Sequence, residues 1–383
     1  MSYMDVFIIA SVSFLIGLLV FPILIKLLVR VDITDTPGGR RIHKFKTPSM
    51  GGIGVMLAAF SAIFIVLDLQ QLAELRFAVG GLILMFFVGL RDDMVNLSAL
   101  QKLGAQVVAA MILILMADVR ITGLYGFMGI YTLPLYTSYA LTLITIIGLT
   151  NAFNLIDGLD GLAGSISFVS FLFLGWWFWD AGFGAYALFS FSMMGGVFAF
   201  LVFNWHPAKI FMGDTGSLSI GFALALLTVL FIDTNGNLYG NSSMNFSAPI
   251  ASGLALLIIP IYDTTRVFIK RAAKGKSPMS PDKSHVHHFL MRMGFRHDQV
   301  TLILISVKLL FIGLIFIMKD LHDAVAIPLV VILAILTGLR LDSVTLKRVK
   351  KINAQEPPVL KKVQKVKPVI QPKVLRNMKV NDN

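Results

Sequence analysis

The sequence predicts an all-α, polytopic integral membrane protein with about eleven transmembrane helices. Hydrophobic residues make up 56% of its 383 positions, charged residues make up 14%, and the mean hydropathy is +0.81. Soluble globular domains carry about 25% charged residues, so this composition excludes that class. Eleven apolar runs approach the roughly 20 residues that a helix needs to cross the hydrocarbon core.

The apolar runs follow one another along the chain without an internal repeat. The third run is short. The expected spans cover 4–29, 51–69, 76–90, 103–119, 138–155, 162–179, 186–203, 217–232, 245–262, 300–318 and 324–341. Related halves with broken helices are typical of secondary transporters, and this sequence shows no such halves.

Lys and Arg set the predicted orientation. No basic residue precedes the first run, whereas Lys26 and Arg30 stand near its end. Because cytoplasmic loops carry an excess of Lys and Arg, this run is predicted to be an uncleaved anchor with its amino terminus outside. The later loops agree, since 30–46 and 266–296 are basic and 233–245 contains neither Lys nor Arg.

The sequence divides into a transmembrane domain over 1–345 and a basic tail over 346–383. The tail is rich in Lys, Val and Pro and has few aromatic residues. Such a segment is expected to be flexible, cytoplasmic and attracted to anionic lipid headgroups. Cysteine is absent, which excludes disulfides and thiolate metal sites.

Three acidic clusters stand at the ends of apolar runs. They contain Asp92 and Asp93, then Asp157 and Asp160, then Asp214. A carboxylate at the edge of a bilayer is costly and is retained mainly where it faces a cavity, a metal or a substrate. The predicted topology puts all three clusters on the cytoplasmic face, so we expect them to form one active site there. The same face receives the histidines His285, His287 and His288.

These residues suit a phosphate substrate bound through Mg²⁺, with Mn²⁺ as the alternative ion. Mg²⁺ prefers oxygen ligands and usually shares a few carboxylates with substrate phosphates. The segment from Gly213 to Ser217 opens an apolar helix, where backbone N–H groups can approach an anion. It lacks the Gly-Lys-Ser/Thr ending of a nucleotide-binding P-loop, and a simple turn with a helix cap is the alternative.

Asn154, Asp157 and Asp160 are spaced by three residues. At helical pitch they would share one face and address a single ligand. The alternatives are that Gly158 and Gly161 break the helix and bring backbone to the ligand, or that the segment only ends a helix.

The histidine segment admits three interpretations. His285, His287 and His288 could bind zinc, although no fourth ligand is evident nearby. They could instead belong to a solvated basic loop, or donate hydrogen bonds to phosphate oxygens. Arg266, which follows Asp263 by three positions, is a candidate clamp for a diphosphate.

Taken together, the motifs resemble the polyprenyl-phosphate N-acetylhexosamine-1-phosphate transferase family, in the family's order and over most of the membrane portion. The residues that carry the resemblance are Asp35-Thr-Pro37, Arg41-Ile-His43, Pro48-Ser-Met-Gly51-Gly52, Asp92-Asp93, 151–164, Phe211-Met-Gly213-Asp214-Thr-Gly216-Ser217-Leu218 and His285-Val-His287-His288.

The resemblance implies transfer of a sugar 1-phosphate from a UDP-activated N-acetylhexosamine to undecaprenyl phosphate in the bacterial cytoplasmic membrane. UMP would leave, and the product would be the first lipid-linked intermediate of a cell-envelope polysaccharide. Positioning and charge neutralisation supply most of the rate in such phosphoryl transfer.

The resemblance also assigns roles to residues. Asp214 is implied to bind Mg²⁺, and Asp92 or Asp93 to act at the acceptor phosphate, with Asp157 and Asp160 completing the catalytic carboxylates. The implied substrate-binding residues are His43, Asn151, Asn154, Gly213, Arg266, His285, His287 and His288. The acceptor phosphate has a second pKa near ~6, so it needs little help from a base, and we favour electrostatic and metal-positioning roles for Asp92 and Asp93.

The His-x-His-His pattern resembles the branch that uses UDP-GlcNAc, with UDP-GalNAc as the near alternative. The branch that uses UDP-MurNAc-pentapeptide has three consecutive histidines, whereas Val286 separates the first two here. Phe289 stands where many relatives of the first branch carry a basic residue.

A cation-coupled transporter is the competing hypothesis, in which the carboxylates would form a relay. Their predicted position on one face argues against it. The expected partners are the UDP-sugar, undecaprenyl phosphate and membrane lipid, without nucleic acid, and a homodimer is left open.

Overall fold

The structure is a computed structural model that describes residues 2–35, 47–238, 244–273, 275 and 285–355. His43 lies outside the described residues. Within them the fold is all-helical, as predicted, except for two short paired strands. The elements are α1 Tyr3–Arg30, β1 Thr34–Asp35, β2 Thr47–Pro48, α2 Gly51–Val66, α3 Leu69–Val95, α4 Ala99–Met116, η1 Phe127–Gly129, α5 Leu135–Ile156, α6 Leu162–Asp180, α7 Gly184–Asn204, α8 Gly213–Asn237, α9 Pro249–Leu256, α10 Ile258–Ala272, α11 Val286–Arg292, α12 His297–Ile317 and α13 Asp323–Gln355.

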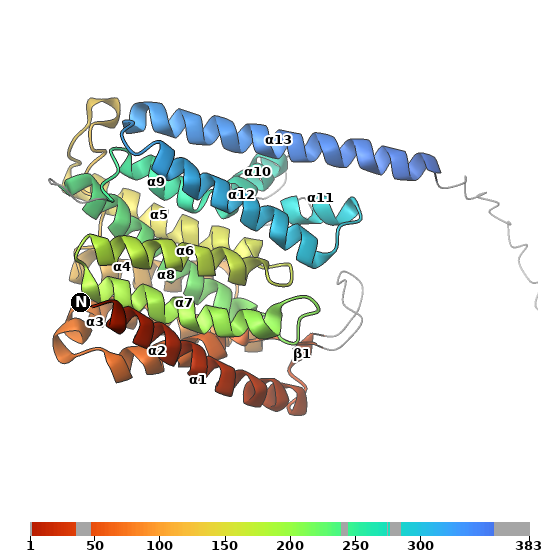
Figure 1. Cartoon of the computed structure of the whole chain (residues 1–383), viewed down its shortest axis with the longest axis horizontal. Helices are drawn as coiled ribbons and strands as arrows, with labels where there is room; N and C mark the ends of the chain where they lie inside the picture. The colour runs from red at the N-terminus through yellow and green to blue at the C-terminus, as the bar shows by residue number, and fades with distance from the viewer. Residues whose placement is uncertain (1, 36–46, 239–243, 274, 276–284, 356–383) are drawn as a thin grey trace, which may run out of the picture.

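The long helices lie side by side in a bundle around α8 (Figure 1). The most apolar window of α8 is 94% buried, and the helix packs against α2, α3, α5, α6 and α9. A helix that is apolar all round belongs in such a core. The outer helix α1 instead exposes Phe7, Leu19 and Ile23, as expected of side chains that face lipid tails.

Polar residues mark where several helices begin. Ser2, Asp68 and Ser98 each cap a helix and exchange hydrogen bonds with the residue three positions later, an arrangement that satisfies two terminal N–H groups. The cap at Asp68 starts α3 seven residues before the predicted start at 76, so the predicted short third span was wrong and α3 has 27 residues.

The predicted number of spans was too high. In the described part of the chain nine helices are long and apolar enough to cross a membrane, or ten if one bent pair counts as a single span. The predicted second span is α2, which has only 16 residues. At ~1.5 Å per residue it covers about 24 Å of a hydrocarbon core of roughly 30 Å.

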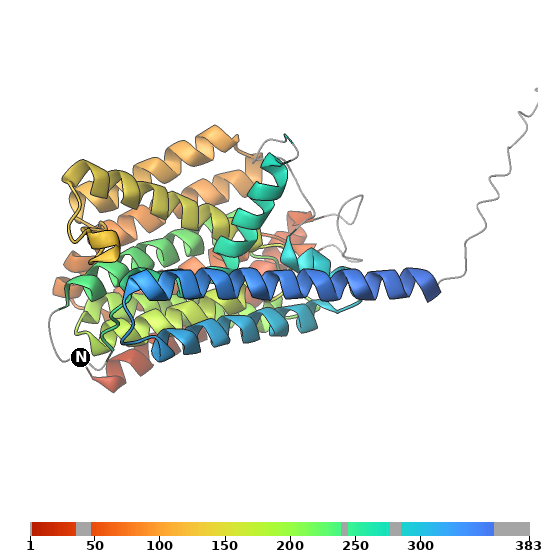
Figure 2. The same ribbon diagram turned by 90° about the horizontal axis from the view of Figure 1, so that it is seen from above.

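The bent pair is α9 and α10, where one span was predicted over 245–262. The two helices meet at Leu257 with an angle of 78°. Pro260 has no N–H to donate to the carbonyl four residues earlier, that of Leu256, which favours a break there. Beyond it, α10 runs steeply across the other helices to Ala272 (Figure 2).

Several connections gather at one end of the bundle. The strand β1 and the helix α11 lie at the end opposite the amino terminus, and α13 projects beyond that end (Figures 1 and 2). This helix continues to Gln355, past position 346 where the sequence predicts the basic tail to begin. The three acidic clusters meet at this same end.

Candidate active site

The five predicted carboxylates line one cavity of about 610 Å³. The cavity receives the end of α3, the connection between α5 and α6, and the beginning of α8. The sequence-predicted residues that line it are Asp92, Asp93, Asn154, Asp157, Asp160, Gly213, Asp214 and His288. Three segments far apart in the sequence therefore converge on one site.

Backbone hydrogen bonds join two of the motif segments at the wall of this cavity. The N–H groups of Gly51 and Gly52 donate to the carbonyls of Phe211 and Met212 at 2.8 and 2.9 Å. A Cβ atom on Gly52 would lie 2.1 Å from the backbone nitrogen of Gly216. Only glycine allows this close approach of α2 to the start of α8.

Asp93 caps the amino end of α8 from the neighbouring helix. Its Oδ1 accepts the backbone N–H of Asp214 at 2.8 Å. Its Oδ2 accepts both the N–H and the hydroxyl of Thr215, at 2.9 and 2.6 Å. Gly213 has φ +70°, and a Cβ there would lie 2.6 Å from Asp93 Oδ2. Both oxygens of Asp93 are therefore committed to holding the α8 terminus.

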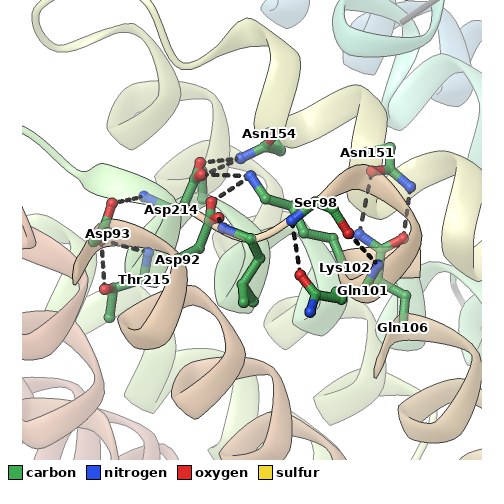
Figure 3. A network of polar contacts seen from close by, with 12 residues as sticks. Asp92, Asp93, Ser98, Gln101, Lys102, Gln106, Asn151, Asn154, Asp214 and Thr215 are labelled. Carbon is green, nitrogen blue, oxygen red and sulfur yellow. Dashed lines mark hydrogen bonds and ion pairs between the residues drawn. The ribbon is translucent and has the colours of Figure 1, made fainter. Parts of the chain in front are cut away.

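Asp92 points to different partners. Its side chain is 3% exposed, forms an ion pair with Lys102 of α4, and accepts the backbone N–H of Leu97 at 2.6 Å. Lys102 also reaches Asp214, with Nζ 2.9 Å from Oδ2 (Figure 3). One lysine thus bridges two carboxylates that would otherwise repel each other.

Asp214 remains partly open, with 31% of its side chain exposed. Asn154 donates to its Oδ1 at 2.7 Å and to the hydroxyl of Ser217 at 2.7 Å. The end of α5 is thereby fixed to the first turn of α8, and the Asp214 carboxylate stays in contact with the cavity.

Asn151 was predicted to bind substrate, but its amide pairs with Gln106 of α4. Asn151 donates to Gln106 at 2.7 Å, and Gln106 donates back at 3.1 Å (Figure 3). The described residues that line the cavity include neither Asn151 nor Gln106. The pair lies one helical turn from Lys102 and from Asn154, so it sets the register of α4 against α5.

The segment after Asn154 leaves the helix, as two of the three alternatives expect. The helix α5 ends at Ile156, and Gly161 has φ +75°. Asn154, Asp157 and Asp160 therefore share a cavity but not a helical face. Burial raises the pKa of Asp157 to about 7, and the negative charges of Asp214 and Asp93 act in the same direction.

Asp160 lies beside two histidines, His206 and His297, to which the sequence analysis assigned no role. Its Oδ2 lies 2.7 Å from His206 Nδ1 and 3.3 Å from His297 Nδ1. Burial acts to raise the pKa of Asp160, but the two imidazoles outweigh it and lower that pKa to about 2. Thr301 also donates to the carbonyl of Asp160 at 3.0 Å, so this loop is tied to the start of α12.

The three histidines of the His-x-His-His segment do different things. His285 Nδ1 lies 2.8 Å from Asp263 Oδ2, and the N–H of Val286 donates to Asp263 Oδ1 at 2.8 Å. His287 is buried beside Gly158. Burial, followed by the nearby His288, lowers the pKa of His287 to about 3, so this imidazole is neutral near pH 7. Only His288 lines the cavity.

The zinc interpretation of that segment finds no support in the described part of the chain. The one group there with three His or Asp ligand atoms within 4.8 Å is Asp160, His206 and His297. The 2.7 Å between His206 Nδ1 and Asp160 Oδ2 is a hydrogen-bond distance, so this contact needs no metal to explain it.

Arg266 lies behind the histidines and does not line the cavity. Its side chain is 8% exposed, and its guanidinium stands 4.7 Å from the ring centroid of Phe289. Lys270 and Arg292 approach the same ring at 5.1 and 5.3 Å. Phe289 therefore gathers three cations, each in contact with the negative face of its ring.

Lys102 is the main residue that the sequence analysis missed. It opens the fourth apolar run four residues after Ser98, on the predicted cytoplasmic side. A cation at that position looks like an ordinary topogenic lysine. Its partners become evident only when α3, α4 and α8 are assembled.

The cavity offers the donor atoms that Mg²⁺ prefers. Asp214 and Asp157 present carboxylate oxygens to it, and no thiolate exists in the chain. Mg²⁺ selects hard oxygen ligands and keeps open positions for substrate phosphates. The partly exposed Asp214, already held in place by Asn154, fits the role of a first ligand.

Comparisons with known proteins agree with this arrangement. Residues 75–232 match the family model described as glycosyl transferase family 4. A probable undecaprenyl-phosphate N-acetylglucosaminyl 1-phosphate transferase of Bacillus subtilis is 30% identical over 78% of this chain and 81% of its own length. A decaprenyl-phosphate N-acetylglucosaminephosphotransferase of Mycolicibacterium smegmatis is 32% identical over 73% of each chain.

A third relative extends the agreement to another bacterial group. An undecaprenyl-phosphate alpha-N-acetylglucosaminyl 1-phosphate transferase of Salmonella typhi is 30% identical over 72% of this chain and 73% of its own length. The matched region includes α3, α4, α5 and the beginning of α8, which supply the carboxylates and the lysine of the cavity. The chain therefore belongs to the polyprenyl-phosphate N-acetylglucosamine-1-phosphate transferases of glycosyl transferase family 4.

Proposed function

We propose that this protein transfers N-acetylglucosamine 1-phosphate from UDP-N-acetylglucosamine to undecaprenyl phosphate. The observation that carries the proposal is the gathering of five carboxylates and one lysine around a cavity of about 610 Å³ at one end of a membrane bundle. Cavities of roughly 300–1,000 Å³ are typical of small-molecule sites. A site at the end of the bundle can meet a water-soluble donor and a membrane-embedded acceptor together.

The reaction exchanges one phosphoanhydride for another. An oxygen of the acceptor phosphate attacks the phosphorus that carries the sugar, and the bond from that phosphorus to the oxygen of UMP breaks. UMP leaves with the bonding electron pair, and the lipid carries a new diphosphate linked to the sugar. The acceptor needs no strong base, because a phosphate monoester has its second pKa near ~6.

Asp214 and Asp157 are the residues that we assign to a bound Mg²⁺, with Mn²⁺ as the alternative ion. When bound, the ion neutralises charge on the diphosphate. Asn154 orients Asp214 through the hydrogen bond to Oδ1, and Asp93 fixes its backbone. The raised pKa of Asp157 is consistent with a carboxylate that has lost water and gained negative neighbours.

Lys102 is assigned to the phosphates together with Asp92. Its Nζ already lies between two carboxylates at the cavity wall, and a lysine in such a position can share its charge with a phosphate oxygen. Asp92 then acts by holding Lys102, whereas both oxygens of Asp93 are used in capping α8. Neither aspartate needs to remove a proton.

The donor is assigned from the relatives and from the histidine segment. All three relatives described above are named for N-acetylglucosamine, and Val286 interrupts the histidines. We assign His288 to the donor because it lines the cavity, with His285 and His287 supporting it from behind. UDP-GalNAc and UDP-MurNAc-pentapeptide are the donors to compare.

We further propose that the cavity faces the cytoplasm of a bacterium, with the amino terminus outside. The basic segment 266–296 includes His288, which lines the cavity. The segment 233–245, which has no Lys or Arg, starts near the carboxyl end of α8, whose amino end lies at the cavity. This orientation brings the cavity to the compartment that contains UDP-sugars. It also leaves the basic tail 346–383 on the same side.

Purified protein in detergent with radiolabelled UDP-GlcNAc, undecaprenyl phosphate and Mg²⁺ tests the proposal. Label should move into the organic phase, and the Asp214→Asn variant should transfer none. If UDP-GalNAc or UDP-MurNAc-pentapeptide transfers label and UDP-GlcNAc does not, the donor assignment is wrong. If none of the three transfers, the enzyme assignment is wrong.

A further inference from the structure

A buried lysine stands at the break between α9 and α10. Lys308 of α12 is 1% exposed and lies within a membrane-spanning helix. Its Nζ donates to the carbonyl of Leu256 at 2.6 Å and to the hydroxyl of Ser170 at 2.7 Å. A lysine inside a bilayer is costly and marks a functional position unless something else explains it.

The proline in α10 explains why that carbonyl needs a donor. In a continuous helix the N–H of residue 260 would donate to the carbonyl of Leu256. Residue 260 is proline, which has no N–H. A carbonyl in the hydrocarbon core without a partner is strongly disfavoured, and Lys308 supplies the missing donor. Ser170 is suited to accept from Lys308, because its own hydroxyl donates to Ile166 at 2.8 Å.

The other end of α9 is held in a complementary way. Asp323, which is 1% exposed at the start of α13, accepts the N–H groups of Ala251 and Ile250 at 2.8 and 3.3 Å. An acidic group at the amino end and a cationic or donor group at the carboxyl end both match the helix dipole. The eight-residue helix α9 is therefore fixed at both termini by side chains from other helices.

The direction of α10 determines where part of the cavity wall lies. Asp263 of α10 holds His285 and the first N–H of α11, as described above. The helix α11 in turn carries His287 against Gly158 and His288 into the cavity. A change in the 78° angle would move Asp263 and, through it, these histidines.

We infer that Lys308 is a positioning residue for the transfer reaction: by satisfying the Leu256 carbonyl that Pro260 leaves without a backbone donor, it fixes the bend that sets α10 and the histidines of α11 at the cavity. This inference rests on the proposed function for its effect on catalysis. Its effect on the direction of α10 does not depend on that function.

Spin labels measure the bend directly, because the chain contains no cysteine. Cysteines introduced at the exposed positions Leu27 of α1 and Ile269 of α10 report the place of α10 relative to the bundle. A second pair at Leu27 and the exposed Leu302 of α12 is the internal reference. In Lys308→Met the first distance should shift or broaden and the second should stay unchanged. The control variant Lys26→Met, on the exposed face of α1, should change neither distance.

A double variant separates positioning from folding. Lys308→Met alone should lower both the unfolding temperature and kcat, the latter by roughly tenfold or more, as misplacement near a reacting centre does. Adding Pro260→Ala restores a backbone N–H for Leu256, so the unfolding temperature should recover. The helix can then straighten, so the distance and kcat should remain altered.

Two results would overturn the inference. One is a wild-type distance between positions 27 and 269 in Lys308→Met. The other is recovery of kcat together with stability in the double variant, which would make Lys308 a structural residue only. If Lys308→Met does not fold, the double variant carries the comparison. If the wild type transfers no sugar phosphate, the proposed function fails, while the distances still decide whether Lys308 fixes the bend.

Discussion

Asp93 accepts the backbone N–H of Asp214 at 2.8 Å, so one carboxylate of the site holds the helix that presents another. Its neighbour Asp92 faces Lys102 instead. Two adjacent residues of the same type therefore have different tasks. One builds the helix terminus, and the other controls the charge beside it.

Asp93→Asn should lower both stability and transfer. The new amide nitrogen cannot accept an N–H, so at least one donor of Asp214 or Thr215 loses its partner, at a cost of about 1–3 kcal/mol. The displaced Asp214 should reduce kcat at least ~10-fold. Thermal unfolding and transfer kinetics check this expectation.

Thr215→Val is the matched control for that variant. It removes only the hydroxyl that donates to Asp93 at 2.6 Å and leaves the two backbone donors in place. Its loss of stability should be smaller than that of Asp93→Asn. An Asp93→Asn protein with wild-type stability and reduced transfer would contradict the capping role.

Lys102→Met should destabilise the protein and reduce transfer, because Asp92 would stay buried without its cation. Removing one partner of a fully buried pair costs roughly 3–5 kcal/mol. Lys102 is 27% exposed, so a smaller loss is expected here. The double variant Lys102→Met with Asp92→Asn should regain stability but not kcat. Recovery of kcat in the double variant would show that Lys102 does not act on substrate.

The pKa of Asp157 predicts a rising pH profile. Because this pKa is raised to about 7, the carboxyl group is protonated in much of the free enzyme below pH 7. If its ionised form assists metal and donor binding, kcat/KM should increase as pH rises through about 7. Asp157→Asn should lower kcat/KM and remove that inflection, and an inflection that persists in the variant belongs to another group.

The raised pKa of Asp157 also predicts that the stability of the fold decreases as pH rises, whereas kcat/KM increases. A carboxyl group whose pKa is higher in the folded than in the unfolded state binds its proton more tightly when folded. Stability is therefore lost as pH rises from about 4, the unfolded value, to about 7. Asp157→Asn should raise the unfolding temperature at pH 8, and this gain should shrink towards pH 4. An equal difference at both pH values would contradict the assignment.

The pair Gln106 and Asn151 predicts coupled effects on stability. Changing Asn151 to leucine leaves the buried Gln106 amide without its partner. Changing Gln106 to leucine leaves the half-buried Asn151 with its hydrogen bond to the carbonyl of Ile147. The double change removes both amides. The coupling energy from a double-mutant cycle of unfolding should be about 0.5–3 kcal/mol. The KM for the donor should change equally in the two single variants. A larger rise in Asn151→Leu would support the prediction that Asn151 binds substrate.

The sequence predicted the bundle and the convergence of the carboxylates because both follow from hydropathy and loop charge. Hydropathy marks 245–262 as one span and did not predict the bend at Leu257, although Pro260 lies inside that span. The sequence also could not show that Lys102 bridges Asp92 and Asp214. Those contacts depend on how α3, α4 and α8 pack, which no local pattern encodes.

His206 and His297 illustrate the same limit. They are 91 residues apart in the sequence, yet the Nδ1 atoms of both lie near Asp160 Oδ2, at 2.7 and 3.3 Å. Each stands in a loop or at a helix start with no local feature that indicates a carboxylate partner. By contrast, Asp93, Asp157 and Asp214 could be predicted, because an acidic residue at the end of an apolar run is conspicuous by itself.

The most direct test of the central claim uses UDP-GlcNAc with one radiolabel in the β-phosphate and another in the sugar. Transfer of sugar 1-phosphate predicts that both labels enter the lipid in equal amounts while UMP is released. Transfer of the sugar label alone, with release of UDP, would contradict the account, because the bond broken would then be the one between sugar and phosphate.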